Sequence, residues 1–416
     1  MILRYLVLLF VIPILGAQPK PTPRLPPPTG PFQIGVMHLP LIDFSRKDLF
    51  DPSNFRKLMI SIYYPILHST TPSKRLPYLP PLLSSLFEAQ HPFPNGTLHT
   101  IIANAKPNAA PLLLPNPRRF IYSHGGGTSR LINTALFEDL ASYGYISIAI
   151  DHPYDAVVVE FPDGTVIYRD PSPFSQEVVD RWYLQRILDI EYIDNITSDL
   201  CVLFNTSKEA GIYSERKLEV DKSDSVDTGF DHIDPVTSQR RTSTPSNSCL
   251  EPKHPRKAVL GGHSFGGTSV AGAMIAQPHR YLGGWNFDGS FWNSSIAGDA
   301  KGPFFIMGGP VRIPAGDTTW DSFRAAQTGW EREVIVNGTQ HWSFTDFAAA
   351  VDVLGLNKTS PEIEAFVGTI SGERAIQIQR EYVRDFLDWI FGAKEGGELV
   401  KGPSGRFPEV DFIPPP

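Results

Sequence analysis

Apolar positions along the chain follow two kinds of pattern, and each predicts one type of secondary structure. Short apolar or alternating runs bounded by Gly and Pro are typical of strands. They predict strands within residues 58–65, 118–127, 145–153, 256–262, 282–290, 302–310 and 332–338, and a hairpin over 157–168. Apolar residues three or four positions apart are typical of amphipathic helices. They predict helices at 131–143, 175–204, 267–276, 319–327 and 373–390.

The alternation of these strands and helices predicts a mostly parallel central sheet with helices on both faces. In the long helix at 175–204, we expect the buried face to carry Leu184, Ile187, Leu188 and Tyr192.

We expect one folded domain over residues 32–395. A Pro-rich leader precedes it at 18–31, and a C-terminal tail follows it at 396–416. Residues 206–255 are polar and irregular, which predicts a surface insertion. The Pro-rich stretch 66–116 is expected to be loop-like.

Residues 1–17 have the three parts of a secretory signal peptide. Arg4 is a short basic region, residues 5–15 are apolar, and Gly16-Ala17 provide small residues for cleavage. The apolar run is about 11 residues long, short of the roughly 20 that a membrane-spanning helix needs. We therefore expect a secreted, extracellular protein, and no later run predicts a transmembrane segment.

An extracellular location gives meaning to two further features. The two cysteines, Cys201 and Cys249, are expected to form a disulfide in an oxidising compartment. Sequons of the type N-x-[ST] predict glycosylation at Asn95, Asn195, Asn205, Asn293, Asn337 and Asn357. The formal net charge is −7 and no basic block occurs, so we expect no nucleic-acid partner.

The most specific motif is the stretch GGHSFGG at 261–267. Residues 262–266 fit G-x-S-x-G, and they lie between a predicted strand and a predicted small-residue helix. In this context a serine nucleophile occupies a strained turn, with glycines where side chains would clash. A phosphate-binding loop would need G-K-[ST], and a dinucleotide site would need G-x-G-x-x-G at the first strand; neither is present. Ser264 is therefore the predicted nucleophile.

A serine nucleophile needs a base and an orienting acid, in the chain order Ser, Asp or Glu, His. His341 follows the last predicted strand by a short loop, where its imidazole can take the serine proton. Two acids fit the order, because Asp288 ends the strand after the elbow helix and Asp317 follows the next strand. Chain order alone does not separate them.

Two backbone N–H groups are expected to bind an oxyanion during the reaction. One belongs to Phe265, after the nucleophile, and the other to Gly126 in the glycine-rich loop SHGGG at 123–127. His124 is expected to brace this loop. It has no metal-ligand spacing with another histidine and H-E-x-x-H is absent, so we expect neither a metal nor an organic cofactor.

Five segments together resemble the platelet-activating factor acetylhydrolase family of secreted α/β-hydrolases. They are FIYSHGGGTSR, SIAIDHPYDA, GGHSFGGTSV, NFDGS and HWSFTDF, and the resemblance runs from about residue 59 to 387 without the polar insertion. It implies the α/β-hydrolase fold, Asp288 rather than Asp317 as the acid, and Gly126 and Phe265 as the oxyanion donors. Members of the family have a bulky residue where this chain has Gly126, so we expect a wider pocket mouth here.

The expected activity is the hydrolysis of a small-molecule or lipid ester through an acyl-enzyme. Trp285, Trp292 and Trp342 bracket the predicted triad and are expected to line an apolar acyl pocket. The resemblance implies the sn-2 acetyl or another short acyl ester of a phospholipid. A general short-chain carboxylesterase or polyester hydrolase is the alternative, and a hydrolase-fold binding protein without activity is a third. Docking on a lipid surface is left open, since the sequence has no basic amphipathic helix.

Overall fold

The computed structural model describes residues 22–66, 75–112, 116–173, 175–199, 204, 257–312, 314–393 and 396–415. The predicted signal peptide, Cys201, Cys249, Asn205 and the predicted insertion at 206–255 lie outside the described residues.

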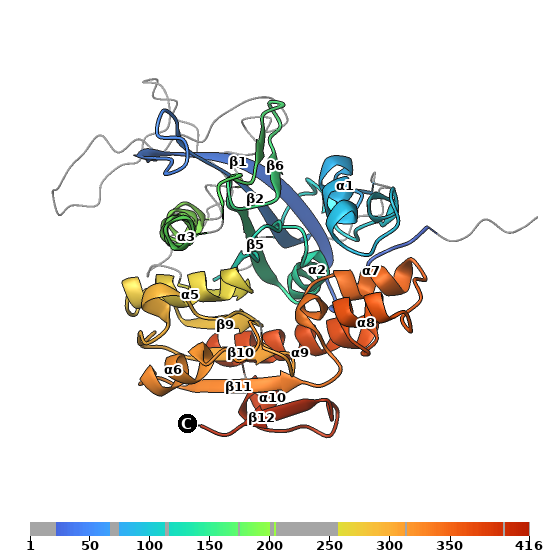
Figure 1. Ribbon diagram of the computed structural model, residues 1–416, viewed down its shortest axis with the longest axis vertical. Coiled ribbons are helices and arrows are strands. Elements are labelled where there is room, and N and C mark those ends of the chain that lie inside the picture. Colours follow the sequence, from blue (N-terminus) through green and yellow to red (C-terminus); the bar gives the residue numbers. More distant parts are fainter. Residues whose placement is uncertain are drawn as a thin grey trace, which may run out of the picture.

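The centre of the molecule is a ten-stranded sheet in the order β12-β11-β10-β9-β8-β4-β5-β2-β1-β3 (Figure 1). Its strands are β1 Gln33–Lys47, β2 Phe55–Ile66, β3 Lys106–Pro107, β4 Arg118–Ser123, β5 Tyr145–Asp151, β8 Ala258–His263, β9 Gly283–Phe287, β10 Phe304–Gly308, β11 Glu331–Val336 and β12 Val410–Ile413. Neighbouring strands from β5 through β4, β8, β9 and β10 to β11 all run parallel. Antiparallel pairs join β5 to β2, β2 to β1 and β11 to β12. The predicted mostly parallel sheet is therefore confirmed.

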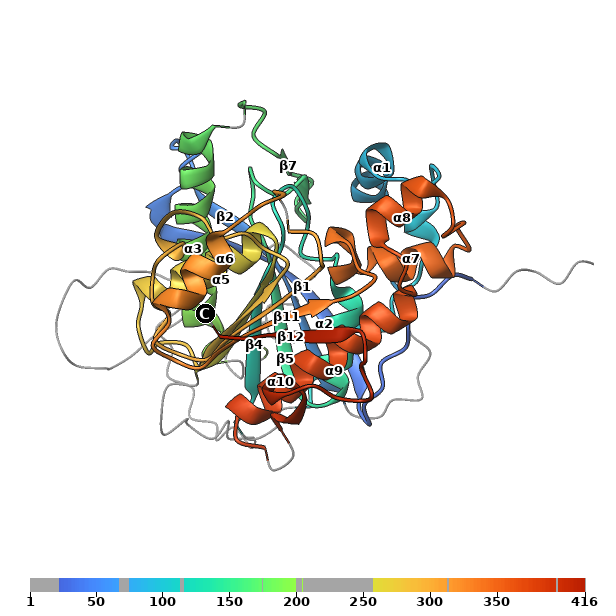
Figure 2. The same cartoon turned by 60° about the horizontal axis from the view of Figure 1, so that its bottom comes forward.

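Helices cover both faces of this sheet, as predicted (Figure 2). One face carries α3, α5 and α6, and the other carries α2, α7 and α9. In the described ranges the α-helices are α1 Pro81–Gln90, α2 Thr134–Ser142, α3 Gln176–Thr197, α5 Phe265–Ala276, α6 Thr319–Ala326, α7 Phe347–Val353, α8 Pro361–Val367, α9 Gly372–Ile390 and α10 Glu398–Lys401. Short 3₁₀ helices are η1 Leu98–Thr100, η2 Asn293–Ser295 and η3 His341–Phe344. The predicted hairpin is a separate two-stranded sheet of β6 Val158–Glu160 and β7 Val166–Tyr168.

The two layers of helices create two hydrophobic cores, one on each face of the sheet. Along β4, Phe120 and Tyr122 pack into the core that contains residues of α2 and α9, whereas Ile121 packs into the core that contains residues of α5. A strand buried on both faces reads as an apolar run without polar alternation. This is why the central strands could be predicted from short apolar stretches.

The N-terminal third is more regular than predicted. The 15-residue strand β1 has no counterpart in the sequence prediction, and it pairs with β2 over most of its length. The helix α1 forms inside the stretch that was expected to be loop-like, and it begins with Pro81, where a missing N–H costs nothing. Its Leu83 and Phe87 are buried in the core.

The packed domain also extends beyond residues 32–395 at both ends. In the predicted leader, Leu25 is buried, and Arg380 donates hydrogen bonds of 2.9 Å to the carbonyls of Pro26 and Pro27. In the predicted tail, β12 adds to the edge of the sheet beside β11. Hydrogen bonds from Arg380 thus fix the segment predicted as a leader, and pairing of β12 with β11 fixes the segment predicted as a tail.

The buried face of α3 agrees with the prediction only in part, since Tyr192 is buried and Ile187 packs against a core as expected. Leu184 is 49% exposed, whereas Trp182, Tyr183 and Arg186 are buried. Arg186 points inward because Asp155 and the carbonyls of His124 and Gly125 accept its hydrogen bonds. Trp182 can be buried beside it because the carbonyl of Tyr154 accepts a hydrogen bond of 3.1 Å from the indole N–H. This rotation brings Val179 and Trp182 toward the site described next.

Candidate active site

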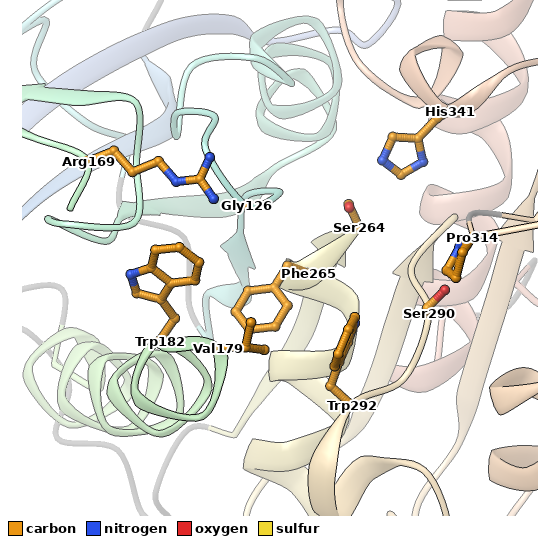
Figure 3. A pocket seen from close by; sticks show the side chains of 10 residues that line it. All are labelled: Gly126, Arg169, Val179, Trp182, Ser264, Phe265, Ser290, Trp292, Pro314 and His341. Atoms are coloured by element: carbon orange, nitrogen blue, oxygen red, sulfur yellow. The ribbon is translucent and has the colours of Figure 1, made fainter. Parts of the chain in front are cut away.

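Ser264 occupies the sharp turn between β8 and α5. Its backbone has φ 53° and ψ −123°, a conformation that non-glycine residues seldom adopt. The turn is held on both sides: the N–H of Ser264 donates to the carbonyl of Phe287 at 2.8 Å, and its carbonyl accepts from the N–H of Gly267 at 2.9 Å. Figure 3 shows the Ser264 hydroxyl on the side of the turn that faces His341. Strain of this kind is often concentrated at functional residues.

Glycines flank Ser264 because the turn leaves no room for side chains. A Cβ atom on Gly262 would lie 2.3 Å from the carbonyl carbon of Gly266, and one on Gly266 would lie 2.0 Å from the carbonyl oxygen of Ser123. Both distances are far below a van der Waals contact. The two glycines of the G-x-S-x-G motif are thus required by close backbone approach.

Asp288 and His341 form a hydrogen-bonded pair beside this turn. Asp288 follows β9 and is buried, and its Oδ2 lies 2.6 Å from Nδ1 of His341. Its Oδ1 accepts a hydrogen bond of 2.8 Å from the N–H of Gly309. With Nδ1 donating to a carboxylate, the imidazole keeps Nε2 as its basic atom. Such a histidine can take a proton from a neighbouring hydroxyl.

Asp317, the alternative acid, has other partners. Its Oδ2 accepts from the hydroxyl of Ser290 at 2.7 Å, and its Oδ1 accepts from the N–H of Thr319 at 2.8 Å. These hydrogen bonds tie the loop before α6 to the loop after β9. The structure therefore places Asp288, and not Asp317, against His341.

His263 connects the base to the elbow. Its Nε2 lies 3.1 Å from the carbonyl oxygen of His341, and the two rings are 4.5 Å apart between centroids. Burial and the neighbouring His341 lower the pKa of His263 well below its usual value, so the ring is neutral and Nε2–H donates. His263 holds the backbone of His341 through this hydrogen bond. It occupies a variable position of the motif, so the sequence motif did not predict this contact.

Two backbone N–H groups point to an oxyanion site. Phe265 is the first residue of α5, where N–H groups lack a partner within the helix. Gly126 lies in the loop after β4 and lines the same cavity as Ser264 and Phe265. In the part of the chain that the structure describes, neither N–H donates a hydrogen bond to the protein. Both donors are therefore available to a ligand oxygen.

Buried charged side chains hold the loop that carries Gly126. Arg186 donates to the carbonyls of His124 and Gly125, and it pairs with Asp155. Asp155 in turn accepts a hydrogen bond of 3.1 Å at its carbonyl from the N–H of Gly127. These contacts fix the loop before any ligand binds, which is what an oxyanion site requires.

His124 is part of this brace, as predicted. It is fully buried, and its Nδ1 lies 2.6 Å from the carbonyl oxygen of Gly125. Burial and the neighbouring Arg186 lower the pKa of His124 well below its usual value. Among the described residues, no group of three or more His, Cys, Asp or Glu side chains is arranged to hold a metal ion.

A cavity of about 250 Å³ opens beside Ser264 (Figure 3). It is lined by Gly126, Arg169, Val179, Trp182, Ser264, Phe265, Ser290, Trp292, Pro314 and His341. Of the three tryptophans expected in the acyl pocket, Trp292 is in this lining. Sequence reasoning missed Arg169, Val179, Trp182, Ser290 and Pro314. For Val179 and Trp182 the missing information was the rotation of α3.

The expectation that Trp285 and Trp342 line the pocket is wrong. Trp285 is fully buried on β9, where its indole stacks on Phe305 at 4.4 Å between ring centroids. Its side chain points to the face of the sheet opposite α5. Trp342 turns toward α1 and α7, where its ring is 4.5 Å from that of His91 and 5.5 Å from that of Phe347. Proximity in sequence to Asp288 and His341 did not bring either side chain to the cavity.

The predicted glycosylation sites that the structure describes all lie at the surface. Asn95, Asn195, Asn293, Asn337 and Asn357 are exposed. Asn293 follows the cavity residue Trp292 directly. In the described ranges, no helix is both long and apolar enough to cross a membrane.

Comparison with known proteins gives matches of three kinds. Residues 17–161 match the family described as platelet-activating factor acetylhydrolase, isoform II. The probable 1-alkyl-2-acetylglycerophosphocholine esterase of Arthroderma benhamiae is 27% identical over 424 residues, which cover 94% of this chain and 93% of that protein. The platelet-activating factor acetylhydrolase of Cavia porcellus is 23% identical over 278 residues, 65% of this chain and 57% of that protein.

Among solved structures, the ferulic acid esterase from Streptomyces cinnamoneus is similar over almost the whole chain. The TM-score is 0.70 at 27% identity, and the match covers 95% of this chain and 100% of that protein. Together the matches confirm the resemblance drawn from the sequence motifs, the α/β-hydrolase fold and the predicted enzyme class, a carboxylic ester hydrolase.

Proposed function

We propose that this carboxylic ester hydrolase forms an acyl-enzyme on Ser264, and that its substrate is the sn-2 acetyl or another short acyl ester of a phospholipid. One observation carries the mechanism: His341, whose Nδ1 lies 2.6 Å from Oδ2 of the buried Asp288, lines the same cavity as the strained Ser264. A nucleophile, a base and an orienting acid are the three parts that acyl transfer to serine needs.

In the first half-reaction, His341 Nε2 takes the hydroxyl proton as Ser264 Oγ attacks the ester carbonyl. The carbonyl oxygen gains a negative charge and accepts hydrogen bonds from the N–H groups of Gly126 and Phe265. Asp288 stabilises the imidazolium that forms and remains ionised. His341 then gives its proton to the leaving alcohol, and the acyl group stays on Ser264.

In the second half-reaction, His341 takes a proton from water, and the hydroxide attacks the acyl-enzyme. The same two N–H groups bind the second oxyanion. Return of the proton to Ser264 releases the carboxylic acid and restores the free enzyme.

The dimensions of the cavity support a short acyl group. Its volume of about 250 Å³ is at the lower end of the size of ligand sites, and its walls include Val179, Phe265 and Trp292. The phospholipid substrate is supported by the names of two relatives, an alkyl-acetylglycerophosphocholine esterase and a platelet-activating factor acetylhydrolase.

A general short-chain carboxylesterase is the second candidate. The ferulic acid esterase matches 95% of this chain at 27% identity, about as much as the probable 1-alkyl-2-acetylglycerophosphocholine esterase, which matches 94% at 27% identity. The small residue at Gly126 also leaves the cavity mouth open, since a Cβ atom there would make only ordinary contacts.

A competitive assay separates the two candidates. Purified protein is given an ether phospholipid with an sn-2 acetyl group and para-nitrophenyl butyrate, and the release of acetate and of nitrophenol is measured. Ser264→Ala is the blank. A strong preference for the phospholipid supports the acetylhydrolase; good butyrate turnover with little acetate release supports the general esterase. If neither ester is cleaved and an active-site phosphonate fails to label Ser264, the chain is a binding protein and the proposal falls.

Secretion belongs to the same proposal. It is supported by the signal-peptide pattern in residues 1–17 and by the surface position of the described sequons. Expression in a secreting host, with sequencing of the mature N-terminus and removal of N-glycans, tests it. A protein retained inside the cells with residues 1–17 intact would contradict it.

A further inference from the structure

We propose that Arg169 and Trp182 form an anion-binding subsite of the active-site cavity, which takes the terminal carboxylate of a short dicarboxylic acyl group rather than an acetyl group. This inference rests on the proposed function, because the subsite acts on the same reaction at Ser264. It adds a specificity that neither the relatives' names nor the catalytic residues assign.

Arg169 reaches the cavity from the end of the β6–β7 hairpin. Its guanidinium carbon lies 4.8 Å from the centre of the Trp182 ring on α3. Its Nη1 also lies beside the glycine loop, since a Cβ atom on Gly127 would be 2.9 Å away from it. Both Arg169 and Trp182 line the cavity that contains Ser264. The hairpin and the helix together thus hold a cation at the wall of the cavity.

The charge of Arg169 has no carboxylate partner in the described ranges. No Asp or Glu oxygen there lies within 4.0 Å of its guanidinium. The nearby carboxylates have other partners: Asp155 is paired with Arg186, and Asp170 Oδ1 accepts from the N–H of Ser172. A guanidinium stacked on an aromatic ring keeps its in-plane N–H donors free to bind a planar anion.

The position of the subsite relative to His341 selects the acyl side of the ester. The leaving alcohol must receive its proton from His341, so the alcohol part lies toward that residue. Figure 3 shows Arg169 and Trp182 across Ser264 from Pro314 and Ser290, the side of the cavity on which His341 lies. The acyl group, which points away from the leaving alcohol, extends toward Arg169. A carboxylate at its far end would accept the fork of two N–H donors.

The test uses two para-nitrophenyl esters of equal length, the half-ester of adipic acid and the corresponding monoamide. They differ only in a terminal carboxylate or carboxamide. The wild-type protein, Arg169→Gln and Arg169→Lys are compared, with Ser264→Ala as the blank for spontaneous hydrolysis. Arg181→Gln is the matched control, because Arg181 also stacks on an aromatic ring, that of Phe50 at 4.3 Å, but does not line the cavity.

We expect the wild type to prefer the carboxylate ester by about tenfold in kcat/KM, as for one charge-assisted hydrogen-bonded pair. Arg169→Gln should abolish this preference mainly through a higher KM for the carboxylate ester, lower kcat/KM for the amide ester by a much smaller factor, and keep the fold intact. Arg169→Lys should retain part of the preference, and added salt should weaken it. Arg181→Gln should behave like the wild type.

Three results would overturn the subsite. An equal loss of kcat/KM on both esters in Arg169→Gln would show that Arg169 has only a structural role. An unchanged preference for the carboxylate ester would show that it has no role. In both cases turnover of the amide ester by the wild type leaves the proposed function standing. A third arm compares acetylated glycerol phosphate with glycerol acetate. If Arg169→Gln affects only that phosphate ester, the anion lies on the alcohol side and the acyl assignment is wrong. Failure of the wild type on every ester would instead contradict the proposed function.

Discussion

Both carboxylate oxygens of Asp288 are fixed, one by Nδ1 of His341 at 2.6 Å and the other by the N–H of Gly309 at 2.8 Å. The carboxylate is buried and follows directly on β9. A rigid strand end thus sets the orientation of an imidazole that is carried on a loop. The proposed mechanism needs such a fixed imidazole, because His341 must stay oriented toward Ser264.

Exchange of each candidate acid for its amide separates their roles. Asp288→Asn should lower kcat by about 10³–10⁴-fold, because an amide at this position no longer favours the tautomer with Nδ1–H. Asp317→Asn should retain activity within about threefold, since Asn can still accept the hydrogen bond from the N–H of Thr319. Kinetics on para-nitrophenyl butyrate, with circular dichroism to verify folding, measures both. Loss of activity only in Asp317→Asn would contradict the assignment.

The strained backbone of Ser264 predicts that glycine at this position makes the protein more stable than alanine does. At φ 53° and ψ −123°, a side chain at position 264 is unfavourable whether it is Ser or Ala. Ser264→Gly should therefore be more stable than Ser264→Ala. Its free energy of unfolding in denaturant should be higher by about 1 kcal/mol, after subtraction of the entropy cost of glycine. Both variants should be inactive. Equal stability of the two would show that the turn stores no strain.

Neighbouring glycines at the site should differ sharply in tolerance. A Cβ atom on Gly126 would lie 3.6 Å from Cβ of Phe265, an ordinary contact, so Gly126→Ala should fold normally and change substrate preference. A Cβ atom on Gly266 would lie 2.0 Å from a backbone oxygen, so Gly266→Ala should lose about 3 kcal/mol or more of stability. Denaturant unfolding and a series of acyl lengths measure the two effects. A lower stability of Gly126→Ala would contradict the conclusion that the cavity entrance has room for a side chain at this position.

The central fold, and the grouping of Ser264, His341 and an acid at one site, could be predicted because they depend on local patterns. Short apolar runs predicted the parallel strands, and the strand–turn–helix context of Ser264 predicted the elbow. The chain order Ser, Asp or Glu, His selected His341 as the base, but it did not distinguish between Asp288 and Asp317 as the acid. That choice depends on which loop the sheet brings to the imidazole, and only the resemblance favoured the acid that the structure pairs with it.

The walls of the cavity could not be predicted, because they come from segments that are distant in sequence. Trp285 is close to Asp288 in sequence but points into the opposite core, since side chains alternate along a strand. Trp182 was missed because Leu184 was expected inside α3, whereas the buried face of that helix carries Arg186. The hydrogen bonds of Arg186 to the glycine loop and to Asp155 determine which face of α3 is buried, and the apolar pattern of the helix does not contain this information.

His152, which contacts the same Ser123 hydroxyl as Arg186, predicts how stability depends on pH. His152 is buried between Asp189, whose Oδ2 is 2.8 Å from Nδ1, and Ser123, whose hydroxyl is 2.9 Å from Nε2. Burial, followed by the charge of Arg186, lowers the pKa of His152 from 6.5 to about 4. The unfolded chain therefore binds a proton at a pH where the folded protein does not. Its contribution to stability is fully present above pH 6.5 and is lost as the pH falls to about 4.

We expect the free energy of unfolding of the wild type to include a loss of about 1.4 kcal/mol per pH unit from His152 in this range. His152→Gln should lack that part of the slope, so its stability approaches that of the wild type as the pH is lowered from 7 to 4. His99→Gln, which removes an exposed histidine of η1, serves as the control and should keep the wild-type slope. Urea unfolding at a series of pH values gives the three curves. Parallel curves for the wild type and His152→Gln would mean that the buried imidazole is already protonated at neutral pH, paired with Asp189 as an ion.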